Sequence, residues 1–172
     1  MENDLDTAVA AIESWDPALS VGNPDIDAEH QRLLRIIAKL KVIITDWERY
    51  GPQTAAVVTE IADYTVSHFS HEEELMRQYG FHVPDAAAQD GNNPQAISHL
   101  NQHRKFIKEF TDLTTRLSGG LAVDLVTVKG EYNRLHAWLV RHIKEKDQLL
   151  ADFISQVQTH SKASPLSSFN RF

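Results

Sequence analysis

Histidines and carboxylates at helical spacings are the residues of this sequence best suited to chemistry. The chain has 172 residues with 9 histidines and no cysteine, which excludes disulfides, thiolate metal sites and a cysteine nucleophile. Three spaced pairs stand out: His68 and Glu72, His99 and His103, and His142 and Asp147. In a chain of this composition each spacing is expected by chance about 0.5 to 0.7 times, so the pairs gain weight only from their placement.

The placement of these pairs favours a metal site over ordinary core packing. Residues four apart lie on one face of a helix, and all three pairs, together with His30, fall on or beside apolar stripes. A single histidine in such a stripe is usually a core residue bonded to a backbone carbonyl. A buried carboxylate such as Glu72 costs several kcal/mol without a cation, and no Lys or Arg occupies a matching stripe position. A metal cluster supplies that positive charge.

The number of candidate ligands predicts two metal ions rather than one. Imidazole with carboxylate suits iron, zinc, copper or manganese, and seven side chains are too many ligands for one ion. If both carboxylates and a solvent-derived oxygen bridge two octahedral ions, all coordination positions but one are filled. A single open position suits one small ligand better than a large substrate.

Four helical patterns position these residues, so we expect an all-α fold, an antiparallel up-down four-helix bundle. Apolar periodicity predicts the helices, which run from Asp25 to the Gly51-Pro52 stop, from about Thr54 to Gln78, from about Ala96 to Leu117, and from about Val123 to Val157. Asp25 or Asp27 is the expected N-cap of the first helix. We divide the chain into an irregular N-terminal arm (1–24), the bundle (25–157) and a disordered tail (158–172), with a long Gly-, Pro-, Asn- and Asp-rich loop at 80–95.

Charge and hydropathy exclude several kinds of partner. The formal net charge of −7 opposes nucleic-acid binding, and no apolar run approaches the roughly 20 residues of a membrane helix. The N-terminus lacks the basic and apolar regions of a signal peptide. We therefore expect a cytoplasmic protein with no nucleic-acid or membrane partner.

Four runs of sequence resemble the hemerythrins, most closely their bacterial members. They are VGNPDIDAEHQRLL, YTVSHFSHEEELM, HLNQH and WLVRHIKEKD, and the resemblance covers about residues 13–155. It implies an oxo- or hydroxo-bridged di-iron centre that binds O₂ reversibly. It further implies one iron held by His99, His103 and His142, another by His30 and His68, and bridges from Glu72 and Asp147.

Several readings of function remain open at this point. Oxygen carriage or storage, oxygen sensing, and a redox-sensing regulatory domain of a signalling protein all fit the resemblance, with a signalling or redox partner protein still unknown. A ferritin-like di-iron oxidase needs Glu-x-x-His pairs, which do not occur in the sequence, so we expect no enzyme activity of that kind and rank a peroxidase or nitric oxide role equally low.

The O₂ ligand also needs an apolar pocket. Residues within a turn of a candidate ligand are the candidates for its lining beside His30 and His68: Leu33, Leu34, Ile37, Phe69 and Trp138. We expect the remaining histidines not to be ligands, with His71 mainly at the surface.

Overall fold

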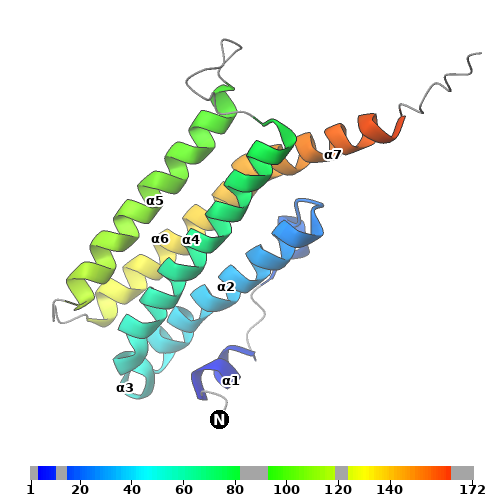
Figure 1. Cartoon of the computed structure of the whole chain (residues 1–172). Helices are drawn as coiled ribbons and strands as arrows, with labels where there is room; N and C mark the ends of the chain where they lie inside the picture. Colours follow the sequence, from blue (N-terminus) through cyan, green and yellow to red (C-terminus); the bar gives the residue numbers. More distant parts are fainter. Residues whose placement is uncertain (1–3, 11–14, 82–92, 119–123, 164–172) are drawn as a thin grey trace, which may run out of the picture.

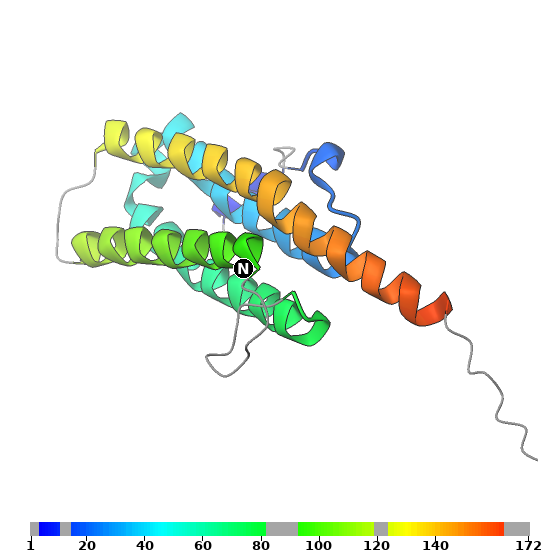
Figure 2. The same cartoon turned by 90° about the horizontal axis from the view of Figure 1, so that it is seen from above.

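Helices form every regular element in the described part of the chain, which comprises residues 4–10, 15–81, 93–118 and 124–163 of a computed structural model. The α-helices are α1 (Asp4–Ala10), α2 (Pro24–Thr45), α3 (Trp47–Tyr50), α4 (Thr54–Tyr79), α5 (Pro94–Ser118), α6 (Leu125–His142) and α7 (Gln148–Ala163). Short 3-10 turns span Pro17–Leu19 and Gly51–Gln53, and a π-helical turn, Ile143–Asp147, joins α6 to α7. Figure 1 shows α2, α4, α5 and α6 side by side, which confirms the four-helix bundle. Figure 2 shows α6 and α7 as one continuous rod.

The start of α2 differs from the prediction in a way that fixes the preceding segment. Asn23, not Asp25 or Asp27, is the N-cap: its Oδ1 accepts the backbone N–H groups of Asp25 and Ile26 at 3.1 and 3.3 Å. Asp27 instead accepts the Ser20 hydroxyl at 2.6 Å and the Val21 N–H at 2.8 Å. These bonds hold the segment before α2 against its first turn.

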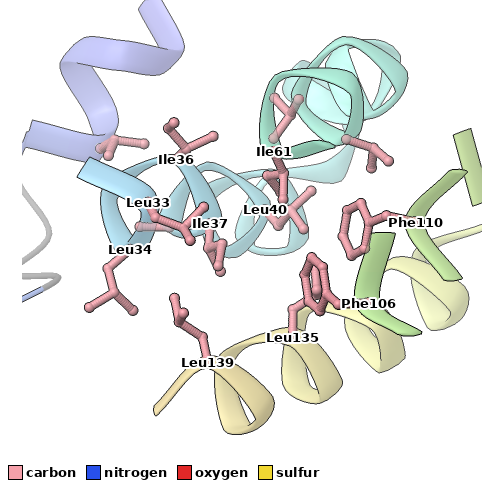
Figure 3. Packing of buried hydrophobic residues seen from close by; sticks show 14 of the residues in the cluster. Leu33, Leu34, Ile36, Ile37, Leu40, Ile61, Phe106, Phe110, Leu135 and Leu139 are labelled. Carbon is pink, nitrogen blue, oxygen red and sulfur yellow. The ribbon is translucent and has the colours of Figure 1, made fainter. Parts of the chain in front are cut away.

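Two apolar clusters enclose a polar layer of the bundle. The larger cluster joins all four long helices, and Figure 3 shows Ile37, Leu40, Ile61, Phe106, Phe110, Leu135 and Leu139 converging within it. The smaller cluster consists of Met76, Phe81, Ala96, Leu100, Leu150 and Ile154. Along α4, α5 and the α6–α7 rod, residues of both clusters flank the candidate ligands or alternate with them. Apolar side chains therefore surround the ligands and exclude water from them.

The sequence predicts an irregular N-terminal arm, but part of this arm is helical. Residues Asp4–Ala10 form α1, whose Leu5 and Val9 are buried in the larger cluster. Lys39 of α2 lies 2.7 Å from Asp6 of α1 and 2.7 Å from Glu60 of α4. The sequence prediction missed this helix because its seven residues carry only two strongly apolar anchors, and their docking on α2 stabilises it more than helix propensity does.

Other boundaries also differ from the prediction. The first helix ends at Thr45 rather than at Gly51-Pro52, because Asp46 caps the separate short helix α3 through a bond from the Arg49 N–H. Helix α7 continues to Ala163, so at least residues 158–163 of the expected tail are helical, while 164–172 lie outside the described residues. Most of the predicted loop, 82–92, lies outside them too. None of the described helices is both long enough and apolar enough to cross a membrane.

Candidate metal centre

The structure brings all seven sequence-predicted ligands together in the polar layer. His30 comes from α2, His68 and Glu72 from α4, His99 and His103 from α5, His142 from the end of α6, and Asp147 from the π-helical turn. Each is at most 1% exposed, so the cluster is fully enclosed.

The π-helical turn explains how Asp147 joins this cluster. In a regular α-helix, residues five apart point about 140° away from each other. The turn Ile143–Asp147 contains more residues per turn than an α-helix, and this rotates Asp147 toward the face that carries His142. Its Oδ1 lies 3.2 Å from Nε2 of His142. The five-residue spacing thus serves the same purpose as the four-residue spacings on α4 and α5.

Five ligand atoms form the first of two groups. Nε2 of His142 lies 3.1 Å from Nε2 of both His99 and His103. Glu72 Oε2 lies 3.2 Å from His103 Nε2, and Asp147 Oδ1 lies 3.0 Å from His99 Nε2. Adjacent ligands of an octahedral ion with bonds of about 2.1 Å are about 3.0 Å apart. The spacing of this group therefore matches neighbouring positions around one octahedral ion.

Four ligand atoms form the second group. They are His30 Nε2, His68 Nε2, Glu72 Oε1 and Asp147 Oδ2. His30 Nε2 lies 3.1 Å from Asp147 Oδ2 and 4.0 Å from Glu72 Oε1, while His68 Nε2 lies 3.7 Å from Glu72 Oε1. Each carboxylate therefore directs one oxygen to each group. The first group has one more donor than the second.

The buried polar atoms of the cluster test whether ions fit here. Both oxygens of Glu72, both oxygens of Asp147, and Nε2 of His30 and His68 are buried without a hydrogen bond of acceptable geometry. Histidine nitrogens nevertheless lie 3.0 to 4.0 Å from those oxygens. Close approach without hydrogen-bonding angles is typical of ligand atoms directed at a shared ion. Two divalent cations would satisfy these atoms, which otherwise carry a large desolvation cost.

The pKa values of these groups show how strongly they influence one another without an ion. Burial lowers the pKa of His142 to about 3. Burial also disfavours the charged form of His99, but its contacts with Asp147 and Glu72 outweigh burial and raise its pKa to about 9. Burial alone would raise the pKa of Glu72, yet the surrounding histidines bring it well below the usual value. At neutral pH His99 thus holds a proton that a bound cation would displace, whereas His142 and Glu72 are already deprotonated.

Three polar side chains contact the outer nitrogens of the ligand histidines, and none of the three is predicted from the sequence to have that role. Glu29 Oε2 lies 2.9 Å from His68 Nδ1, Gln102 Oε1 accepts a bond from His142 Nδ1 at 2.8 Å, and Glu73 Oε1 lies 3.5 Å from His103 Nδ1. Such partners fix the tautomer and the ring orientation of a ligand.

Glu29 has a second partner as well. Its Oε1 lies 2.9 Å from Nδ1 of His71, whose side chain is 36% exposed. His71 is therefore half-buried and part of the outer contacts of the site. The only sequence signal for Glu29 was its position next to His30.

Two aromatic rings stack on histidines of the first ligand group. Phe69 stacks on His103 with ring centroids 3.7 Å apart, and Trp138 stacks on His142 at 4.5 Å. Trp138 precedes His142 by four residues on α6, so both lie on one face. Leu33, Leu34 and Ile37 are buried in the larger apolar cluster (Figure 3). We had expected all five to line a pocket beside His30 and His68, and Trp138 instead lies against a first-group ligand.

Comparison with known proteins agrees with this geometry. Residues 21–154 match the family model described as the hemerythrin HHE cation binding domain. The chain is 32% identical to a bacteriohemerythrin of Stenotrophomonas maltophilia over 87% of this chain and 84% of that protein. It is 28% identical to a hemerythrin-like protein of Naegleria gruberi, over 82% of this chain and 92% of that one, and 29% identical to a myohemerythrin of Riftia pachyptila, over 77% and 86%. The chain belongs to the hemerythrin family.

Proposed function

We propose that this protein binds O₂ reversibly at two iron ions and serves as an oxygen carrier or store. In this proposal the first iron is bound by His99, His103 and His142, and the second by His30 and His68. Glu72 and Asp147 bridge the two. The observation that carries the proposal is the division of each buried carboxylate, with one oxygen in each group of ligand atoms.

The donor set favours iron. Five imidazoles and two carboxylates, with no thiolate, suit iron better than the softest metals, and the family membership points the same way. When bound, an oxo- or hydroxo-bridged pair of irons supplies two electrons to O₂ and recovers them when O₂ leaves.

The chain's own residues determine where O₂ can bind. A shared bridging oxygen would add one ligand to each iron, giving six around the first and five around the second. The open position therefore lies beside His30 and His68. Both side chains are at most 1% exposed, so the layer is enclosed and has no opening for a large substrate at these residues.

The surroundings of the open position favour release of O₂ over further reaction. The larger apolar cluster excludes water from one end of the polar layer, so few protons are available there. Glu29 accepts the Nδ1 proton of His68 and directs Nε2 of that ring toward the second group.

Repeated oxygenation tests the proposal. We expect iron-loaded, anaerobically reduced protein to take up O₂, to release it under argon, and to repeat the cycle without loss of iron. An oxidase would instead consume O₂ and produce water or hydrogen peroxide, and a peroxidase would consume hydrogen peroxide. Irreversible consumption of O₂ in the first cycle would contradict the proposal.

A further inference from the structure

A surface groove between α5 and α6 is lined by residues that touch the candidate metal centre. It has a volume of about 520 Å³, and its lining includes Gln102, Lys105, Glu109, Arg134, Trp138 and Arg141. Two of them touch the buried ligand His142: Gln102 accepts its Nδ1–H at 2.8 Å, and the Trp138 ring stacks on it at 4.5 Å with 15° between the planes. Trp138 is itself only partly buried. The groove is thus separated from a ligand ring by a single indole.

The groove lies on the positively charged part of an acidic protein. Residues 94–147 carry 9 Lys and Arg against 6 Asp and Glu, whereas the rest of the chain carries 8 against 18. Within the groove, Arg134 pairs with Glu109 at 2.6 Å. Lys105, whose side chain is 78% exposed, lies 3.9 Å from the same Glu109, and the exposed Arg141 adds further positive charge, so the groove lining has three cationic side chains and one carboxylate. The cationic side chains of the groove attract a negatively charged partner, and the acidic excess of the rest of the chain disfavours its binding there.

An oxygen-binding iron pair needs a reductant. If the proposed function holds, occasional loss of bound O₂ in reduced form leaves both irons ferric, and they must be reduced again before O₂ can bind. The ligands are enclosed, so a protein reductant cannot touch the irons directly. Electron exchange weakens steeply with distance, and a stacked ring that reaches the surface shortens the path.

We propose that this groove is the docking site of an acidic one-electron carrier protein, and that electrons enter through Trp138 and His142. The inference rests on the proposed function. Two reduced carriers each lose one electron, the two ferric ions become ferrous, and one proton from solvent neutralises part of the added charge at the bridging oxygen. No bond to the protein forms or breaks.

Reduced flavodoxin, a small acidic flavoprotein, is a suitable probe. The oxidised iron-loaded protein is mixed anaerobically with flavodoxin hydroquinone at low salt, and binding of oxidised flavodoxin is measured separately by calorimetry. The groove variant is Lys105→Glu with Arg141→Glu. Its matched control is Arg35→Glu with Lys41→Glu on the exposed side of α2, which changes the net charge equally.

We expect the groove variant to lower the second-order rate of reduction at least tenfold, which is within the usual range for electrostatic steering, and to weaken flavodoxin binding. The control should remain within about twofold of the wild type. Added salt should lower the reduction rate of the wild type toward the rate of the groove variant. Equal effects of the two variants, or no effect of either, would overturn the docking site.

Substitution of Trp138 separates docking from electron entry. At flavodoxin concentrations that saturate each variant, so that a change in affinity does not affect the rate, Trp138→Leu should slow electron transfer within the complex, whereas Trp138→Phe should restore most of the rate. Wild-type transfer in Trp138→Leu would refute the route. Reduction by dithionite provides the separate check: if dithionite-reduced wild type does not bind O₂, the proposed function fails, and if it does, a missing groove effect refutes only this inference.

Discussion

Substitution of Glu29 perturbs the candidate centre selectively, because the Glu29 carboxylate contacts a ligand histidine without being a ligand itself. One oxygen lies 2.9 Å from His68 Nδ1 and the other 2.9 Å from His71 Nδ1. Burial tends to raise the pKa of Glu29, but both histidines outweigh burial and lower it, so the group is ionised at neutral pH. Glu29→Gln keeps the size of the side chain and removes the charge.

The structure indicates the size and the direction of the effect. In Glu29→Gln an NH₂ group replaces one of the two oxygens, and that group cannot accept the hydrogen bond from the histidine nitrogen it faces. Loss of such an outer partner typically lowers metal affinity 10- to 100-fold, or by about 1.4 to 2.7 kcal/mol. His68 belongs to the four-donor group, which has fewer ligands to compensate. We therefore expect Glu29→Gln to weaken the second iron and leave the first nearly unchanged.

An anaerobic titration of metal-free protein with Fe²⁺ measures this directly. Wild type should retain two irons per chain after gel filtration, and Glu29→Gln should approach one at limiting iron. His71→Gln is the matched control, because it removes the outer contact and leaves the bond between Glu29 and His68. Unchanged affinity for both irons in Glu29→Gln, or equal loss of both, would refute the argument.

Three further predictions follow from the same geometry. Glu72→Gln should reduce the content of both irons, since each oxygen of Glu72 belongs to a different group; full iron content with normal oxo-bridge absorption would rule out the bridge. The raised pKa of His99, about 9, predicts that the metal-free protein loses stability as pH rises from about 6.5 through 9, by up to about 3 kcal/mol. The sign follows because the folded state binds this proton more tightly than the unfolded state does. Thermal unfolding should show that fall in Tm for metal-free protein but not for iron-loaded protein, and a metal-free Tm that rises over this range would contradict it. Leu34→Ala should cost about 2 to 5 kcal/mol of unfolding free energy and speed loss of the oxygenated form by admitting water; unchanged autoxidation and O₂ affinity would remove Leu34 from the pocket.

The fold and the gathering of candidate ligands were predictable because both depend on periodicity. Apolar residues at helical spacing identified the four long helices, and histidines four apart had to share a face. Burial of Glu72 followed from its place in the apolar stripe. These features require no knowledge of which helix lies beside which.

The features that escaped prediction depend on tertiary contacts or on local departures from helical geometry. The π-helical turn that aims Asp147 inward has no signal in periodicity. Glu29 reaches His68 across the α2–α4 interface, so its role appears only when the two helices are packed together. Helix α1 likewise forms where Leu5 and Val9 find a surface on α2.

Anomalous diffraction at the iron edge, from crystals of the iron-loaded protein, tests the central claim most directly. We expect two iron peaks per chain, both bonded to Glu72 and Asp147. One peak should be bonded also to His99, His103 and His142, and the other to His30 and His68. A single peak, or two peaks without a shared carboxylate, would contradict the account.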